Sequence, residues 1–246
     1  SNLLGRQSRV TERMIKTIDL TVGYGGRPVL EHFNFELRKN EVLCLIGHNG
    51  AGKSTLIKSL YGLIPRQHGE IFIGEEKSDR IEPRLLTDKG ISLVPEGRGI
   101  FPGLTVQEIM KMGMWAAGIA KGQRADRLEW VMSILPALKN FYHQRAGTLS
   151  GGQQQIVSIG RAMLSRPHCL LMDEPSIGLA PKLFQDLLQP IRELQLSTGM
   201  SILLVEQNVR EALKISDRVL VMKAGAIIQE SLPQDLSDNA KLMELY

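Results

Sequence analysis

A glycine-rich segment in the first quarter of the chain ends in a lysine and two hydroxyl residues. Residues 43–55 read Leu-Cys-Leu-Ile-Gly-His-Asn-Gly-Ala-Gly-Lys-Ser-Thr. They fit the pattern Gly-x-x-x-x-Gly-Lys-[Ser/Thr], whose backbone N–H groups cradle phosphates at the N-terminus of a helix. In this pattern Lys53 reaches the β- and γ-phosphates, and the Ser54 hydroxyl binds Mg²⁺. The segment therefore predicts binding of a nucleoside triphosphate.

The phosphate loop needs a strand before it and a helix behind it. Residues 43–46 form a short apolar run typical of a strand buried on both faces, and we expect a helix over 55–61 that ends at Gly62. An ordinary glycine turn needs neither element, so this context favours phosphate binding. His48 occupies a variable position of the loop and is expected to be a solvated side chain. The candidate binding residues of the loop are Gly47, His48, Asn49, Gly50, Ala51, Gly52, Lys53, Ser54 and Thr55.

Tyr24 stands in Gly-Tyr-Gly-Gly, at the end of the first predicted strand. An aromatic side chain there could cap a hydrophobic edge or stack on the base of a nucleotide. Its position before the phosphate loop favours stacking, so we include Tyr24 among the candidate nucleotide-binding residues.

A second candidate anion site lies at 149–153, which reads Leu-Ser-Gly-Gly-Gln. A helix is predicted behind it, with Ile156, Ile159 and Met163 on its apolar face. Ser150 fits the N-cap position, so the next N–H groups and the positive end of the helix dipole would face an anion. Such a cap is weak evidence when it stands alone. The candidate residues are Ser150, Gly151, Gly152 and Gln153.

Short apolar runs elsewhere in the chain predict the core sheet. They are continuous rather than alternating, as expected for parallel strands covered by helices on both faces. These runs lie at 91–94, 169–172, 202–205 and 219–222. Residues 15–37 alternate instead, which predicts antiparallel strands with one face in water. The chain is therefore predicted to have an α/β fold.

The segment 97–166 has a different pattern. Strand signals disappear, and apolar residues recur at helical spacing over 106–114 and 128–135, so we expect an inserted helical subdomain. Residues 96–103, Glu-Gly-Arg-Gly-Ile-Phe-Pro-Gly, lead into it and are interpreted as a hinge. The first helix carries a stripe of Met110, Met112, Met114 and Trp115. This stripe could be a partner-binding surface, but core packing is the preferred interpretation.

Composition limits the class of protein. The 246 residues are 43% hydrophobic, which is enough for a sizeable core. The net charge of +4 suits polyphosphates or an anionic membrane surface and is too small to indicate nucleic acid. No apolar run approaches the length of a membrane span, so a membrane role is expected to be peripheral. Cys44 and Cys169 lie in apolar runs and are interpreted as buried thiols in the reducing cytoplasm.

Two carboxylates follow a buried strand in Leu170-Leu-Met-Asp-Glu-Pro175. Together with the phosphate loop and the Leu-Ser-Gly-Gly-Gln segment, they make the chain resemble the ATP-binding subunit of ABC transporters over about residues 15–228. More narrowly, the chain is similar to the branched-chain amino acid importer type. The segments that carry this similarity are Val94-Pro-Glu-Gly-Arg98, Gln144-Arg-Ala-Gly-Thr148, Glu174-Pro-Ser-Ile-Gly-Leu-Ala-Pro181 and Leu204-Val-Glu-Gln-Asn208.

The resemblance implies a P-loop ABC ATPase core with a mostly parallel sheet, an N-terminal antiparallel β subdomain and an inserted helical subdomain. The chain would be a single ABC ATPase domain, with its nucleotide-binding core at 15–95 and 167–246 and its helical subdomain at 97–166. Residues 1–12 begin Ser-Asn without an initiator methionine and are interpreted as a tail or a remnant of an expression vector.

The resemblance also implies the chemistry. Two subunits would pair head to tail, with each ATP between the phosphate loop of one chain and the 150–153 segment of the other. Asp173 is expected to orient Mg²⁺ through water, and Glu174 to be the base that activates the attacking water. Glu96 and Gln207 are expected to complete the catalytic site, with Glu96 also on the Mg²⁺ side.

Three positions depart from the usual family pattern. Glu96 stands where a glutamine normally touches Mg²⁺ and the attacking water, and Gln207 stands where a histidine contacts the γ-phosphate. Residues 177–180, Ile-Gly-Leu-Ala, lack the carboxylate that normally crosses the dimer. Two interpretations stay open. The preferred one is a working ATPase whose sensor positions accept these variants; the other is a slow regulatory site whose partner performs most hydrolysis.

The expected partners are membrane-spanning permease subunits, a second ABC ATPase subunit, most often a different chain in this type, and indirectly a solute-binding protein. The expected location is the cytoplasmic face of the plasma membrane, as a peripheral subunit. Importers of urea or short amides are the main alternative. DNA-repair and chromosome-structuring ATPases need a long coiled coil, but about 120 residues without sustained heptads separate Lys53 from Asp173. A translation-factor ATPase would carry two cassettes in one chain, whereas this chain has one. The candidate base Glu174 argues against a purely structural or binding module.

Overall fold

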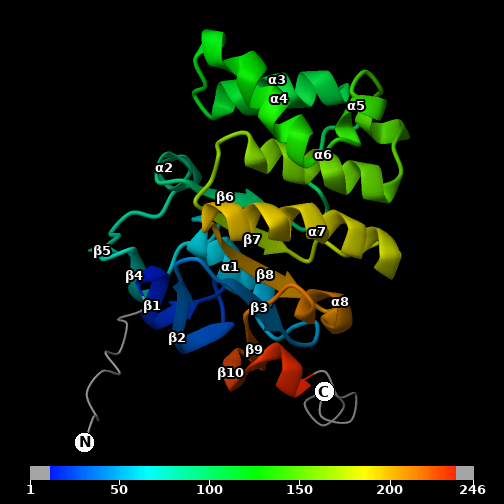
Figure 1. The fold of residues 1–246 in the computed structure, drawn as a ribbon. Coiled ribbons are helices and arrows are strands. Elements are labelled where there is room, and N and C mark those ends of the chain that lie inside the picture. The colour runs from blue at the N-terminus through cyan, green and yellow to red at the C-terminus, as the bar shows by residue number, and fades with distance from the viewer. Residues whose placement is uncertain (1–11, 237–246) are drawn as a thin grey trace, which may run out of the picture.

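Within the part of the chain that the structure describes, the strands form two sheets, one of six strands and one of four (Figure 1). The computed structural model describes residues 12–236. All but the last residue of the predicted tail at 1–12 lies outside the described part, as do residues 237–246 at the end of the predicted core.

The six-stranded sheet contains every predicted continuous apolar run. Its order is β10-β9-β3-β8-β7-β6, and all neighbours are parallel except β10 and β9. Every residue of β3, β7 and β8 is buried, which explains why these strands do not alternate. The strands are β3 (Val42–Ile46), β6 (Ile91–Val94), β7 (Cys169–Asp173), β8 (Ser201–Glu206), β9 (Arg218–Lys223) and β10 (Ala226–Ser231). The predicted α/β fold with a mostly parallel sheet is confirmed.

The four-stranded sheet is antiparallel and has the order β2-β1-β4-β5. Buried and less buried residues alternate along β2, as the sequence pattern predicts. The predicted N-terminal antiparallel part is therefore present. Its strands are β1 (Arg13–Val22), β2 (Leu30–Arg38), β4 (His68–Ile73) and β5 (Glu76–Lys77).

Helices cover the six-stranded sheet and extend above it in Figure 1. Over residues 97–166, all of which the structure describes, the chain forms helices and no strand, apart from one isolated bridge between Thr105 and Arg145. The helices are α1 (Lys53–Leu60), α2 (Pro83–Asp88), α3 (Val106–Ala116), α4 (Arg124–Ile134), α5 (Leu138–Phe141), α6 (Gly151–Met163), α7 (Pro181–Thr198) and α8 (Val209–Leu213), with 3₁₀ turns η1 (Lys121–Gln123), η2 (Ala146–Thr148) and η3 (Pro233–Leu236).

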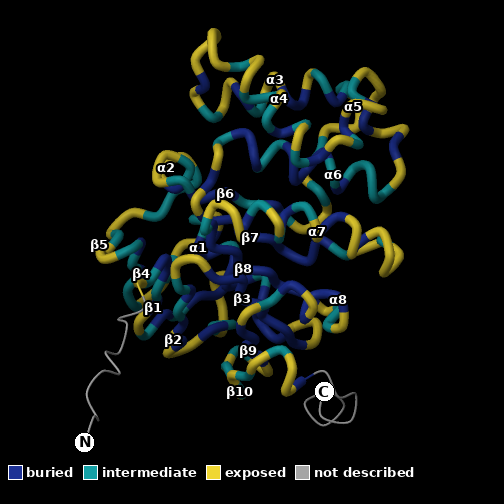
Figure 2. The backbone as a smooth tube through the Cα atoms, viewed as in Figure 1, coloured by how far each residue is buried: buried dark blue, intermediate teal, exposed yellow. Residues whose placement is uncertain are grey.

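The core lies on both faces of the six-stranded sheet. Along β3, Leu43 and Leu45 belong to one buried cluster with α1, whereas Cys44 and Ile46 belong to another with α6 and α7. Figure 2 shows the central strands as the most continuously buried part of the chain. Both cysteines are buried and free, as predicted. Burial raises the pKa of each thiol, which keeps both protonated and unreactive.

Several local predictions need correction. The first helix begins at Lys53 and ends at Leu60, because Gly62 adopts a left-handed φ of 78° beyond it. The sequence reasoning missed α7, β4 and β10. The Met stripe of α3 is only half core: Met110 and Met114 are buried, whereas Met112 and Trp115 are exposed.

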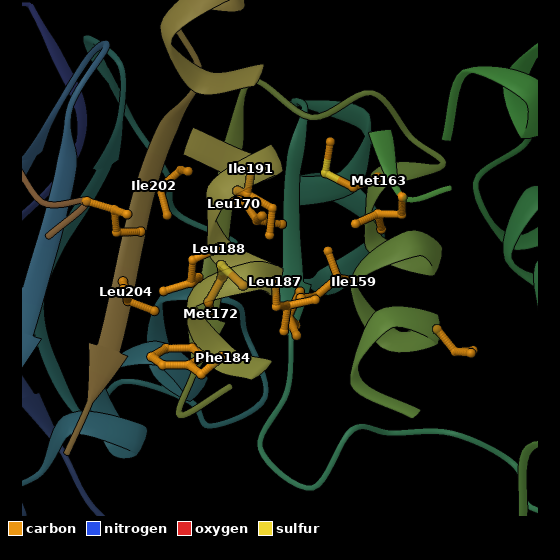
Figure 3. Close-up of a cluster of buried hydrophobic side chains, with 14 of the residues drawn as sticks. Ile159, Met163, Leu170, Met172, Phe184, Leu187, Leu188, Ile191, Ile202 and Leu204 are labelled. Atoms are coloured by element: carbon orange, nitrogen blue, oxygen red, sulfur yellow. The ribbon is translucent and has the colours of Figure 1, made fainter. Parts of the chain in front are cut away.

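The packing of α7 on the sheet gives the first testable prediction (Figure 3). Phe184 is fully buried between α7 and residues of β7 and β8 such as Met172 and Leu204. Phe184→Ala should lower the free energy of unfolding by about 3–5 kcal/mol, since the cavity cannot close against a rigid sheet. Denaturant unfolding would measure this. Leu196→Ala, at a 68% exposed position of the same helix, should change stability by less than about 0.5 kcal/mol.

Candidate active site

The phosphate loop leaves β3 and enters α1 at Lys53. Gly52 is the N-cap of α1 with a φ of 101°, a conformation that favours glycine. A Cβ on Gly47 would lie 2.5 Å from the carbonyl oxygen of Met222, so the loop passes β9 too closely for a larger residue. The first turn of α1 has no side-chain cap and no acidic residue. Its N–H groups, which have no partner within the helix, are therefore placed to bind an anion.

Lys53 is a buried cation held by the loop itself. Its Nζ donates to the carbonyl oxygens of Gly47 at 2.6 Å and His48 at 3.0 Å, and lies 3.4 Å from Oε1 of Glu174. Only 3% of Lys53 is exposed. These contacts keep the ammonium inside the loop, where phosphate oxygens could replace the carbonyls as its partners.

The Mg²⁺ side of the site joins two elements. Ser54 Oγ donates to Oδ1 of Asp173 at 2.9 Å, which links α1 to the end of β7. Burial raises the pKa of Asp173 to about 6; Glu96 and Glu174 raise it as well, and the bond from Ser54 lowers it. A cation placed here would favour the ionised carboxylate. These oxygen donors fit Mg²⁺.

No group of three His, Cys, Asp or Glu side chains among residues 12–236 could hold a metal. Mg²⁺ is usually held by one or two protein ligands together with substrate phosphates and water. The donor set is thus suited to an ion that arrives with a nucleotide.

Glu174 lies beside Lys53 and is 6% exposed. Its backbone N–H donates to the carbonyl of Val205 at 2.9 Å, and its φ of 46° turns the chain sharply away from β7. Gln207 Nε2 donates to Oε2 of Glu174 at 2.9 Å and to Oδ1 of Asn49. The amide of Gln207, which follows β8, therefore bridges the phosphate loop and Glu174, which follows β7.

The second anion site has the predicted cap. Ser150 Oγ accepts from the N–H of Gln153 at 3.3 Å, and Gln153 Oε1 accepts from the N–H of Ser150 at 2.9 Å. This reciprocal pair is a capping box, so Ser150 is the N-cap of α6. The N–H groups of Gly151 and Gly152 lie in the first turn, where they have no partner within the helix.

The predicted residues gather at two separate places. A cavity of about 370 Å³ is lined by the loop from Asn49 to Thr55 together with Glu96, Glu174 and Val29. Tyr24 is 63% exposed, and its hydroxyl lies 3.4 Å from Oγ1 of Thr55 at the margin of this cavity. His48 is exposed, as expected. The residues 150–153 do not line this cavity; Ser150, Gly152 and Gln153 line another, beside α7.

Comparison with known proteins gives the family. The family model described as "ABC transporter" matches residues 30–177. The chain belongs to the ABC transporter family. It is 40% identical to the "High-affinity branched-chain amino acid transport ATP-binding protein BraG" of Pseudomonas aeruginosa, over 91% of this chain and 94% of that protein. It is 32% identical to the "Probable branched-chain amino acid transport ATP-binding protein LivF" of Archaeoglobus fulgidus, over 94% and 98%.

The fold agrees with solved members of the family. MJ1267, described as "an ATP-binding cassette of an ABC transporter", superposes with a TM-score of 0.85 at 27% identity, over 96% of this chain and 99% of that one. The predicted family and the ATPase activity are thereby confirmed, so the nucleotide is ATP and the reaction yields ADP and phosphate. Within residues 12–236, no helix is long and apolar enough to cross a membrane.

Glu206 is a buried residue of this ABC ATPase that the sequence reasoning did not single out. Its carboxylate accepts from the N–H of Ser176 at 2.9 Å, from Ser176 Oγ at 2.6 Å and from the N–H of Gln207 at 3.1 Å. It thus ties the loop after Glu174 to the loop after β8. Burial raises the pKa of Glu206 to about 7, and the bonds from Ser176 and Gln207 oppose this rise. The sequence did contain a signal for this residue, because Glu206 ends an apolar strand directly before the candidate site residue Gln207.

The raised pKa of Glu206 predicts how stability depends on pH. The folded chain binds this proton more tightly than the unfolded chain, so stability should fall as pH rises from about 4.5 to about 7. For this one group the fall amounts to roughly 3 kcal/mol. Glu206→Gln should remove that part of the slope in urea unfolding across this range. The exposed Glu129→Gln on α4 is the control, and an unchanged slope in Glu206→Gln would contradict the prediction.

Proposed function

We propose that this chain is the ATP-hydrolysing subunit of an importer for branched-chain amino acids, bound peripherally at the cytoplasmic face of the membrane. The observation that carries the proposal is the cavity lined by Lys53, Ser54 and Glu174, with Asp173 hydrogen-bonded to Ser54. Lys53 would bind the phosphates, Ser54 and Asp173 would hold Mg²⁺ directly or through water, and Glu174 would remove the proton from the attacking water.

The two separate anion sites support a head-to-tail dimer. Within one chain, residues 150–153 border a different cavity from the one that Lys53 and Glu174 border. A second ABC ATPase subunit can bring its own α6 N-terminus to this chain's phosphates, with Ser150, Gly151 and Gly152 facing the γ-phosphate. The other chain is then either a copy of this one or a related subunit.

The geometry around Gln207 supports the interpretation of a working site. Its amide donates to Glu174 and reaches Asn49 in the phosphate loop, so it occupies the sensor position with a hydrogen-bond donor that does not titrate. Glu96 borders the same cavity and is exposed, so its carboxylate is accessible to a Mg²⁺ ion that would be bound there. The retained base and the full phosphate loop therefore favour turnover over a regulatory role.

We propose that the permease subunits dock in a groove beside the hinge at residues 96–103. It has a volume of about 490 Å³ and lies between α2, α3, α6, β6 and the segment that follows α1. Its lining includes the exposed side chains Leu63, Phe101 and Met112. Such an uncovered apolar surface suits a helix of a membrane subunit. The groove adjoins the segment that carries Glu96, so closure of the dimer can move the permease through it.

The substrate is proposed from the similarity to BraG and LivF, whose names give branched-chain amino acids. The chain's own cavities face nucleotide and partner subunits, and the solute itself would contact the permease and the solute-binding protein. Urea and short amides remain the alternative substrates.

Removal of the proposed base gives the first test. Glu174→Gln preserves the size of the side chain and its place beside Gln207, but it cannot accept a proton. ATP turnover should fall by at least about 10²-fold, while the affinity for ATP should change little. Phosphate release and equilibrium binding of a fluorescent ATP analogue would measure the two. The exposed Glu193→Gln on α7 should keep the parental rate; a parental rate in Glu174→Gln would remove Glu174 from the mechanism.

The substrate proposal requires the assembled transporter. We expect leucine-loaded solute-binding protein to stimulate ATP turnover of the complex in lipid vesicles, and urea-loaded protein to leave it unchanged. The complex would be purified through a tag on this chain, with the Glu174→Gln complex as the control for contaminating ATPases. Stimulation by urea alone would replace the substrate and keep the mechanism.

A further inference from the structure

The hinge contains three successive residues with left-handed backbone. Gly97, Arg98 and Gly99 have φ angles of 73°, 71° and 55°. Glycine adopts this conformation without a steric penalty, whereas a residue with a Cβ keeps it only where other contacts hold it. Arg98 is therefore held in a strained backbone conformation between two glycines. The hydrogen bonds of its side chain account for this conformation.

The Arg98 guanidinium joins three segments that are distant in the sequence. Its Nη1 donates to Oε1 of Gln154 on α6 at 2.9 Å, and its Nη2 donates to the carbonyl oxygen of Ile177 at 3.2 Å. Gln154 in turn donates through Nε2 to the carbonyl of Ala146 at 3.0 Å. One side chain thus links the segment after Glu96, the α6 N-terminal turns and the loop after Glu174.

A side chain on either of two neighbouring glycines would displace this guanidinium from its present position. A Cβ on Gly151 would lie 2.8 Å from Arg98 Nη2, and a Cβ on Gly178 would lie 2.9 Å from it. The absence of a side chain at Gly151 and Gly178 therefore lets the Arg98 guanidinium lie against both residues. Arginine presents a planar fork that can reach two acceptors at once, which a lysine cannot reproduce.

The charge of Arg98 suits a site that receives an anion. The guanidinium lies against the first turns of α6, where the helix dipole is positive and no acidic residue is present. Both of its hydrogen-bond acceptors, Gln154 and the Ile177 carbonyl, are neutral. Two positive ends close together repel each other until a negative group comes between them or near them.

We propose that Arg98 is a positioning residue that fixes the N-terminus of α6 to the hinge and to the loop after Glu174. A shift of the hinge at Glu96 would be passed by Arg98 to Gln154, and so to the Ser150–Gly152 turn that would meet the partner's ATP. This role rests on the head-to-tail dimer proposed above. In the loop after Glu174, the Ile177 carbonyl is the group that receives the link.

The test compares two arginines that share a backbone conformation. Arg98→Gly removes the link and relieves the left-handed strain. Arg166→Gly also relieves a left-handed backbone, with a φ of 51°. The Arg166 guanidinium, however, stacks over Trp130, 5.0 Å from the ring centre, so this variant serves as the control. Steady-state ATP turnover of the full chain, binding of a fluorescent ATP analogue and thermal unfolding would be measured for each variant.

We expect Arg98→Gly to lower kcat by about 10-fold or more, because small misplacements of catalytic groups are costly, while ATP affinity stays within about twofold. Arg166→Gly should keep the parental kcat. Gln154→Leu should reproduce the loss, and the double variant should fall no further, as expected for two residues that act as one unit. Arg98→Lys keeps the charge but not the fork, so it should not restore kcat.

Three results would overturn the proposal: a kcat within about twofold of parental in Arg98→Gly, an equal loss in Arg166→Gly, or restoration by lysine, which would make charge alone sufficient. ATP turnover of Glu174→Gln would be measured in parallel, so that failure of the Arg98 proposal can be told apart from failure of Glu174 as the proposed base. A parental rate in that variant counts against Glu174 and leaves the comparison of the two arginines readable.

Discussion

Four ionisable side chains are buried where the central parallel strands end, and their pairing constrains the whole site. Lys53, Asp173, Glu174 and Glu206 are each no more than 6% exposed. A buried charge is tolerated only with partners, and each has one: loop carbonyls and Glu174 for Lys53, Ser54 for Asp173, Gln207 for Glu174 and Ser176 for Glu206. ATP with Mg²⁺ can replace several of these partners by phosphate oxygens and metal. The fold thus holds the catalytic groups in place before the nucleotide arrives, at a cost in stability that binding can recover.

The sheet register places these groups together. Ile46, before the phosphate loop, pairs with Glu206, and Asp173 pairs with Val205, so three strands end side by side with their loops on one edge. Parallel order makes this possible, since every strand then delivers its carboxyl end to the same side. The two core clusters, one on each face of β3, lock the register because a slip of one residue would exchange the faces. Packing far from the nucleotide, such as Phe184 against β8, therefore supports the geometry of Glu174.

The sequence was most informative where a single physical cause decided the local structure. Buried parallel strands gave continuous apolar runs, and the phosphate loop gave its glycines and Lys53. It was least informative where signals conflicted. Helix α7 begins with Pro181 and is followed by the left-handed Gly199, both good boundary signals, but Pro190 inside it argues against a helix. Strand β10 lies at an edge and alternates weakly. Glu206 could be named as a neighbour of Gln207, but two of its four hydrogen bonds come from Ser176, in a loop from another part of the chain.

The departures from the usual family residues acquire a common physical meaning in this arrangement. A histidine at the position of Gln207 could change its charge near neutral pH, whereas the amide donates to Glu174 at any pH. Beside it, Glu206 has its pKa raised to about 7, so a second titrating group one residue away would couple to it. An amide avoids that coupling. The loop after Glu174 lacks the usual carboxylate at Ala180, which leaves less negative charge near the phosphates. The extra negative charge of Glu96 is thus offset at one other position of the same site, where residues 177–180 lack a carboxylate.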